Sequence, residues 1–211
     1  MSRAMRCSAV CSRLKSIRLP LLLGLLLLGV SLCLPSCREK VYTPKPRAYY
    51  RIDMPEPSYR QLDTTAYPYA FAYSILAEIR PRTDVKEPYW INLYYPAWNA
   101  TLHVSYKRVN NNLDQLVEDA RFFTTKQIPK AEDLLESSVY DTVAHVYGKI
   151  YEITGTHVAC TYQFWLTDRE KHFFRGALYF HTTPNNDSLA PVLQFVQRDM
   201  EHLIETFRWR E

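Results

Sequence analysis

Glycine is scarce in this chain, with only 5 residues among 211, and it does not recur at every third position. This excludes a collagen-like protein, and the lack of sustained heptads excludes a long coiled coil. A wholly disordered chain is excluded as well, because 47% of the residues are hydrophobic. The length suits one globular domain and is too short for two large ones.

Acidic residues are missing from the first 36 positions, which hold five basic residues. Without those five, the chain has 21 basic residues against 22 acidic ones, a net charge of −1, although the whole chain carries +4. The basic balance therefore belongs to the N-terminal segment. We predict no binding to nucleic acid.

The sequence also lacks the motifs of common active sites: G-x-S-x-G, the P-loop, H-E-x-x-H and C-x-x-C. His172 and His181 lie nine positions apart, which places them on opposite faces of a regular strand and argues against joint metal binding. We expect no enzyme activity and no cofactor, and we identify no small-molecule substrate. A hydrolase whose site is invisible in the sequence is the alternative.

A leucine-rich run follows the basic residues at positions 19–34 and ends in Leu34-Pro35-Ser36-Cys37. Its 16 residues are short for a transmembrane helix, and they fit a signal peptide over residues 1–36. The Leu, Ser and Cys positions resemble the lipobox of bacterial lipoproteins, which implies a diacylglycerol thioether on Cys37. An uncleaved signal anchor is the alternative.

Cys160 is the only cysteine after Cys37, so the mature domain has no internal disulfide. It lies in an alternating run with Tyr162 and Phe164, which predicts that its thiol points into a core. A reactive thiol is the alternative.

Proline-rich sequence over residues 37–69 predicts an extended tether. Its tyrosines, Tyr59 among them, are costly in a fully solvated spacer, so we expect part of the tether to pack on the domain or on a partner. The globular domain is predicted to span residues 70–211.

Strand patterns cover residues 70–78, 89–95, 101–107, 142–154, 157–167 and 172–181. The short turn at 168–171 requires antiparallel neighbours. A first helix follows Asn112, with Gln115 completing a capping box, and the stretch 133–138 is ambiguous.

The last helix has an unbroken apolar stripe from Val192 to Phe207, with Asp187 or Ser188 as its cap and Pro191 in its first turn. This order predicts an α+β fold, an antiparallel sheet flanked by helices. It resembles the Mog1/PsbP-like sandwich.

The densest polar cluster includes Asp168, His172 and Arg175. A mixed-charge turn is more simply a hairpin tip than an active site, and these three residues are our candidate partner contacts. Arg175 lies inside an apolar strand, where an unpaired charge is expensive. We expect it to pair with a carboxylate across the sheet or, alternatively, to contact a partner.

Two stretches, residues 45–59 and 163–209, together with Leu116-Val117-Glu118-Asp119-Ala120-Arg121, resemble the GldD family of gliding-motility lipoproteins of Bacteroidetes. The runs RGALYF and PNNDS carry the resemblance. It implies an outer-membrane lipoprotein needed for gliding and type IX secretion, with no catalytic residues to transfer. The family has a Lys-His pair near the helix end where this chain has Lys126-Gln127.

These observations favour a non-enzymatic scaffold that is anchored in the membrane through Cys37 and binds other envelope, motility or secretion proteins. Residues 38–40 lack an acidic run, so we expect the domain to face the periplasm. A second hypothesis is a module that binds envelope polysaccharide through exposed aromatic residues such as Trp98.

Overall fold

The computed structural model describes residues 53–62, 66–181 and 186–210, all within one compact unit, Tyr49–Glu211. The predicted signal peptide, Cys37 and most of the predicted tether lie outside the described residues. Within these ranges, no helix has both the length and the apolar character needed to cross a bilayer.

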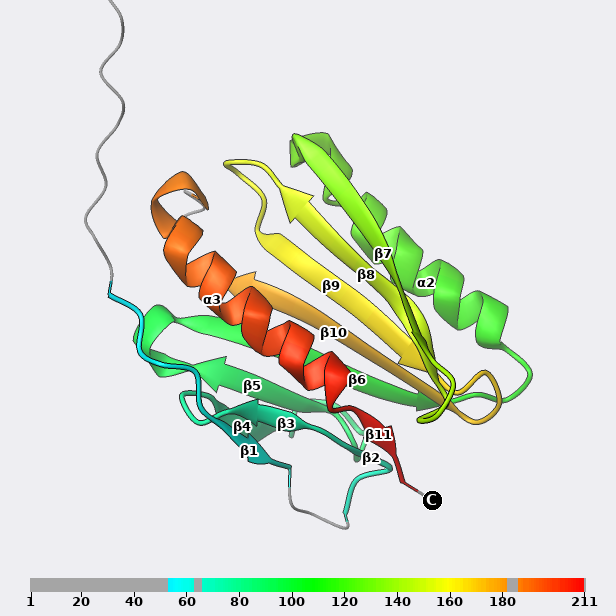
Figure 1. Ribbon diagram of the computed structural model, residues 1–211. Helices are drawn as coiled ribbons and strands as arrows, with labels where there is room; N and C mark the ends of the chain where they lie inside the picture. Colours follow the sequence, from blue (N-terminus) through cyan, green and yellow to red (C-terminus); the bar gives the residue numbers. More distant parts are fainter. Residues whose placement is uncertain (1–52, 63–65, 182–185, 211) are drawn as a thin grey trace, which may run out of the picture. The chain divides into compact units, whose positions relative to one another are not determined.

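A seven-stranded antiparallel sheet forms the body of the fold, in the order β4-β5-β6-β10-β9-β8-β7 (Figure 1). Its strands are β4 (Glu78–Pro81), β5 (Ile91–Tyr95), β6 (Ala100–Arg108), β7 (Asp133–Asp141), β8 (Val146–Thr154), β9 (Cys160–Thr167) and β10 (His172–Phe180). The turn at 168–171 joins two antiparallel neighbours, β9 and β10, as predicted.

Two helices cover opposite faces of this sheet: α2 (Leu113–Thr125) and α3 (Asn186–Glu205) (Figure 1). Alternation along the strands explains the two faces. Leu102, Val104 and Tyr106 of β6 belong to the large core on the α3 face. A smaller cluster, formed by Leu116, Ala120 and Phe173, lies under α2. The structure thus confirms the predicted α+β fold, an antiparallel sheet flanked by helices.

The apolar stripe of α3 is docked on the sheet. Its members are 0–8% exposed: Val192, Phe195, Val196, Met200, Leu203, Ile204 and Phe207, the last just beyond the helix. The helix begins at Asn186, so Pro191 lies beyond the first turn in which the sequence placed it.

Residues N-terminal to the sheet also pack on it. Strand β1 (Tyr59–Gln61) pairs with β3 (Ala72–Ser74), and β2 (Tyr69–Ala70) pairs with β11 (Arg208–Trp209). Leu62 is 2% exposed, and the Tyr59 ring stacks on His202 with centroids 3.8 Å apart. The packed body therefore starts before residue 70, the predicted boundary, and the expectation that part of the tether packs is confirmed.

The predicted strand over 70–78 is three short strands, because the chain turns after Ser74, where the Ala77 amide donates to the Ser74 carbonyl at 3.0 Å. The ambiguous stretch 133–138 belongs to β7.

Helix α2 begins after Asn112, as predicted, but without the capping box. The Asn112 side chain instead accepts a hydrogen bond from the Asn110 amide at 2.8 Å. Only Leu116, Ala120 and Thr124 of this helix are buried, so α2 is held by a narrow contact.

Candidate functional site

The structure places the three candidate contact residues on two faces of the sheet. Asp168 and His172 meet at the β9–β10 hairpin, and His172 stacks on Trp209 with ring centroids 5.1 Å apart. Arg175 is three positions further along β10, so its side chain emerges on the opposite face, toward α2. The three residues therefore do not form one site.

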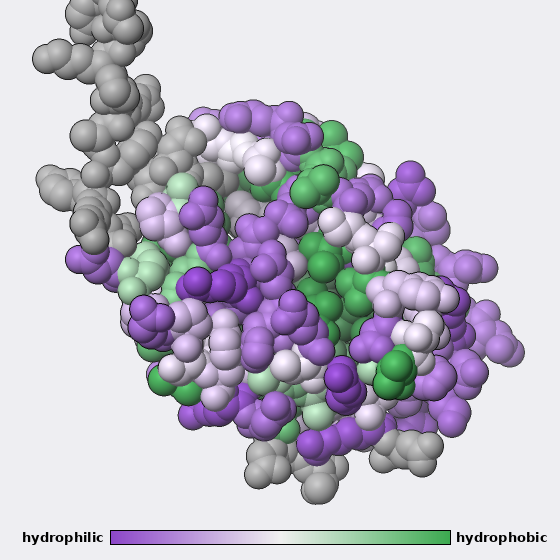
Figure 2. Space-filling model, in the orientation of Figure 1, coloured by the Kyte–Doolittle hydropathy of each residue, from purple (hydrophilic) through white to green (hydrophobic). Residues whose placement is uncertain are grey.

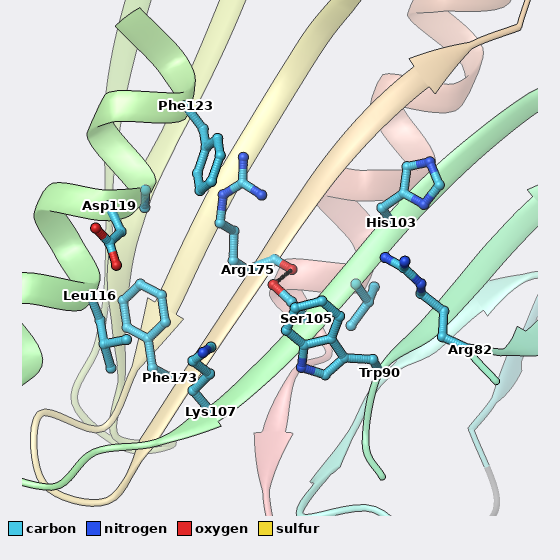
Figure 3. A pocket seen from close by; sticks show the side chains of 12 residues that line it. Arg82, Trp90, His103, Ser105, Lys107, Leu116, Asp119, Phe123, Phe173 and Arg175 are labelled. Atoms are coloured by element: carbon cyan, nitrogen blue, oxygen red, sulfur yellow. Dashed lines mark hydrogen bonds between the residues drawn. The ribbon is translucent and has the colours of Figure 1, made fainter. Parts of the chain in front are cut away.

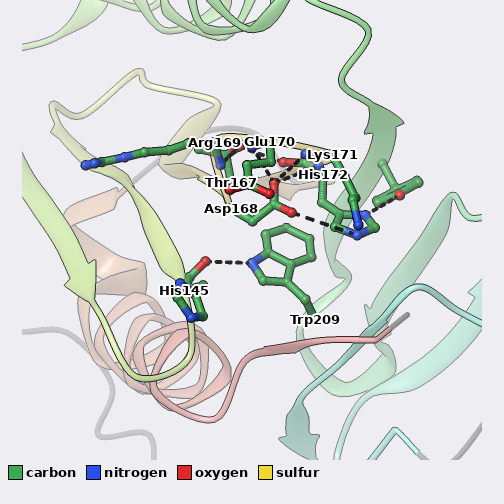
Figure 4. Close-up of polar contacts among 9 residues, drawn as sticks. His145, Thr167, Asp168, Arg169, Glu170, Lys171, His172 and Trp209 are labelled. Carbon is green, nitrogen blue, oxygen red and sulfur yellow. Dashed lines mark hydrogen bonds and ion pairs between the residues drawn. The ribbon is translucent and has the colours of Figure 1, made fainter.

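Asp168 organises the hairpin turn (Figure 4). Its Oδ1 accepts hydrogen bonds from the backbone amides of Glu170, Lys171 and His172 at 2.8–3.0 Å. Burial alone would raise the pKa of Asp168, but these three donors together hold that pKa below its usual value. The carboxylate thus has a structural role at the turn.

His172 is enclosed by partners of its own (Figure 4). The Tyr106 hydroxyl lies 2.6 Å from its Nδ1, and its Nε2 is 3.9 Å from Asp168 Oδ2. Burial lowers the pKa of His172, against the opposing effect of Asp168. The neutral ring can therefore accept the tyrosine hydrogen bond, and Trp209, which donates from Nε1 to the His145 carbonyl at 3.0 Å, covers it.

His181 lies on the other face, as the spacing predicted. Its Nε2 is 2.9 Å from Thr101 Oγ1, and its ring lies 6.3 Å from that of His103. Within the described ranges, no three histidine, cysteine or acidic residues are grouped so that they could hold a metal ion.

Arg175 does not have the carboxylate partner that the sequence favoured. Its neighbours across the sheet are Ser105 and Trp165, neither of them acidic. Its Nη2 donates to Gln163 Oε1 at 2.7 Å, and its guanidinium lies 4.8 Å from the centre of the Phe123 ring. Burial lowers the pKa of Arg175, yet a guanidinium stays charged in proteins. The strand thus carries a partly buried cation without an ion pair in the described part of the chain.

Arg175 lines a cleft of about 370 Å³ between α2, the strands β6 and β10, and the segment that joins β4 to β5, and we call it the α2 cleft (Figure 3). Its walls are formed by Arg82, Trp90, His103, Val104, Ser105, Lys107, Leu116, Asp119, Ala120, Phe123, Phe173 and Arg175. Three of these residues are basic and one is acidic.

Two residues of the cleft, His103 and Arg82, are neutral or already paired. His103 Nδ1 lies 2.8 Å from Asn92 Oδ1, and burial followed by the nearby Arg82 lowers the pKa of His103. Arg82 itself pairs with Asp84 at the rim. Arg175 and Lys107 are therefore the cleft cations that have no ion-pair partner among the described residues.

Cys160 is fully buried, as predicted, but it is on a different face from Tyr162. A register shift at Leu178/Tyr179 pairs Cys160 with Tyr179, on the side of Arg175. Burial raises the pKa of its thiol to about 12. A protonated buried thiol is a poor nucleophile, so this cysteine is structural.

A second groove lies on the other side of α2, with a volume of about 350 Å³, and we call it the ring groove. Tyr140, Tyr147 and Trp165 line it, and Arg169 lies 3.9 Å from the centre of the Tyr147 ring. The indole N–H of Trp165 is buried without a hydrogen-bond partner among the described residues.

Sequence reasoning missed both the α2 cleft and the ring groove, because each gathers residues from elements far apart in the chain. Only one signal was visible: a single arginine within the apolar strand at 173–180. Its neighbours in the cleft come from before β5, from β6 and from α2.

A family model described as gliding motility lipoprotein GldD matches residues 39–209. No curated protein matches the chain. Among solved structures, the chain is similar to cyanobacterial PsbP (CyanoP) from Synechocystis sp. PCC 6803, with a TM-score of 0.48 and 10% identity. That similarity covers 76% of this chain and 97% of the cyanobacterial one. Since the matched residues make up most of the chain, the chain belongs to the gliding motility lipoprotein GldD family.

Proposed function

We propose that this protein is a non-enzymatic scaffold of the gliding-motility and type IX secretion machinery, held on the outer membrane by a lipid on Cys37 and facing the periplasm. Family membership supports a motility-associated lipoprotein, and the lipobox-like sequence supports the anchor. The scaffold role requires a surface that binds other proteins.

The free edge of β7 is the observation that carries the proposal. Strand β7 is nine residues long and pairs with β8 on one side, and no other described strand pairs with it. Two large apolar side chains on it are exposed, Leu135 at 56% and Tyr140 at 69%. A long exposed edge of this kind is a template for adding a strand from another chain.

The opposite edge of the sheet is protected in the way that monomeric proteins protect edges. Strand β4 has only four residues and ends in Pro81. Arg80 forms a salt bridge with Glu78 at 2.7 Å and covers the Tyr94 ring at 3.8 Å. Short length, proline and charge all discourage pairing, so β7 is the edge that suits a partner.

An apolar surface also continues inward from β7. Figure 2 shows hydrophobic residues gathered in the hollow between α3 and the strands β8 and β7. Val139 and Ile150 are partly buried on this face, against the main core. A partner strand that adds to β7 could therefore place apolar side chains beside them.

We test this surface with Leu135→Lys and Tyr140→Lys, combined in one chain and expressed in a strain that lacks the protein. Both side chains are exposed, so the fold should keep its melting temperature, whereas lysines on an edge oppose strand addition. We expect normal membrane levels but loss of surface spreading or of type IX secretion. The matched control is Ile75→Lys, at an apolar side chain that is 53% exposed elsewhere. Full activity of the β7 variant would refute the proposed surface.

The ring groove supports a second candidate function, the binding of envelope polysaccharide. Sugars stack on aromatic rings, and three rings line this groove beside polar side chains, including those of Lys149 and Arg169. Titration with fragments of envelope glycans should then show saturable binding that Tyr147→Ala abolishes. No binding by the wild-type protein would eliminate this function without affecting the β7 proposal.

A further inference from the structure

Arg175 offers the α2 cleft more hydrogen-bond donors than the described residues use. A guanidinium has five N–H groups in a planar fork. One bond is made, from Nη2 to Gln163 Oε1 at 2.7 Å. Figure 3 shows the guanidinium standing beside the Phe123 ring at the α2 wall of the cleft. A partly buried cation with unused donors is costly, and an anion in the cleft would satisfy these donors.

The charge around the cleft fits one negative group. Asp119 is the single acidic residue among the lining residues, while Arg82, Lys107 and Arg175 are basic. Because Asp84 already neutralises Arg82, the remaining excess is one positive charge. A carboxylate matches both this excess and the fork of Arg175, which binds carboxylates through two parallel hydrogen bonds.

Apart from His103 and Ser105, the rest of the lining is apolar or aromatic. Phe173 is 4% exposed, Leu116 is 7% exposed, and Phe123 and Trp90 close opposite sides of the cleft (Figure 3). The volume of about 370 Å³ lies in the range of small-ligand pockets. A ligand that fits should therefore join one carboxylate to one compact apolar or aromatic body.

We propose that the α2 cleft is a binding site for such a ligand, with the carboxylate on Arg175 and the apolar body between Phe123 and Trp90. This chemistry has two sources, a free aromatic or aliphatic acid and the C-terminal residue of a polypeptide. The site is independent of the β7 edge.

Ligand-observed NMR on the full-length lipidated protein in detergent tests the site. The probes are N-acetylphenylalanine, its amide, and a peptide ending in phenylalanine with a free or an amidated C-terminus. We expect the two acids to bind saturably. Both amides should bind at least roughly tenfold more weakly, because they cannot form the charge-assisted pair with Arg175. Tighter binding by the peptide acid than by the free acid assigns the polypeptide source, and equal binding assigns the small acid.

Arg175→Gln should weaken the binding of the two acids by roughly tenfold or more and leave the binding of the amides unchanged. The matched control is Arg169→Gln, which removes an arginine beside the Tyr147 ring on the other side of α2. This variant should bind the acids and the amides as the wild type does. If Arg175→Gln lowers the melting temperature, Phe123→Ala, at a ring that is 46% exposed, replaces it and should weaken the acids. Equal binding of acid and amide, or no binding of either acid, would overturn the proposal.

Discussion

Two partly buried charged residues, Asp168 and Arg175, differ in how far along the chain the neighbours that fix their roles lie. Asp168 binds three amides within four residues, so its turn could be predicted from the local sequence. Arg175 could be recognised as anomalous, because a charge interrupts an apolar strand. Its surroundings could not, because Gln163 and Phe123 reach it only after β9, β10 and α2 are assembled.

Asp199 gives a prediction at this scale. It lies on α3 at 1% exposure, where the Tyr95 hydroxyl donates to its Oδ2 at 3.3 Å. Burial raises its pKa, although hydroxyl groups partly oppose this. The native state therefore favours the protonated acid. The contribution of Asp199 to the stability of the fold is full below its unfolded pKa of about 4, and it is lost as the pH rises through its native pKa.

The substitution Asp199→Asn removes this pH-dependent loss of stability. We expect the variant to gain thermal stability relative to the wild type as the pH rises from 4 to 7, because an amide carries no charge at either pH. Melting temperatures at both values, taken as the difference between the two proteins, measure the effect. A difference that stays constant with pH would contradict it.

At the scale of elements, periodicity was a good guide where one face of an element is buried. It predicted α3 and the alternation of β6, since both bury a continuous apolar side. It was a poor guide at β7, whose exposed edge has no clear alternation. It also missed the division of 70–78, because the turn after Ser74 has neither glycine nor proline to mark it.

Leu203→Ala tests the docking of α3. Leu203 is 0% exposed, and truncating a buried leucine costs about 2–5 kcal/mol of unfolding free energy. We expect the melting temperature to fall by several degrees. Leu135→Ala, at an exposed leucine of β7, is the control and should change stability by less than about 0.5 kcal/mol. An unchanged melting temperature for Leu203→Ala would mean that the helix is not packed as described.

At the scale of the whole molecule, the proposed function requires a folded body and a lipid anchor, and the anchor lies outside the described residues. Lipid attachment to Cys37 predicts that Cys37→Ser abolishes lipid labelling and processing, because the thioether can form only on a thiol. Metabolic labelling with a fatty-acid probe, followed by membrane fractionation, measures both. Normal labelling of the variant would exclude the lipoprotein assignment of this cysteine.

Site-specific photo-crosslinking in intact cells tests whether the lipid-anchored body binds protein partners through β7. A photoreactive residue replaces Ser137, which is exposed at the middle of β7, or Lys86, which is exposed near the opposite edge. Binding through β7 predicts discrete adducts with envelope proteins from position 137 that are absent from position 86 and are lost when Leu135→Lys and Tyr140→Lys are added. No adduct at position 137, or the same adducts from both positions, would contradict it.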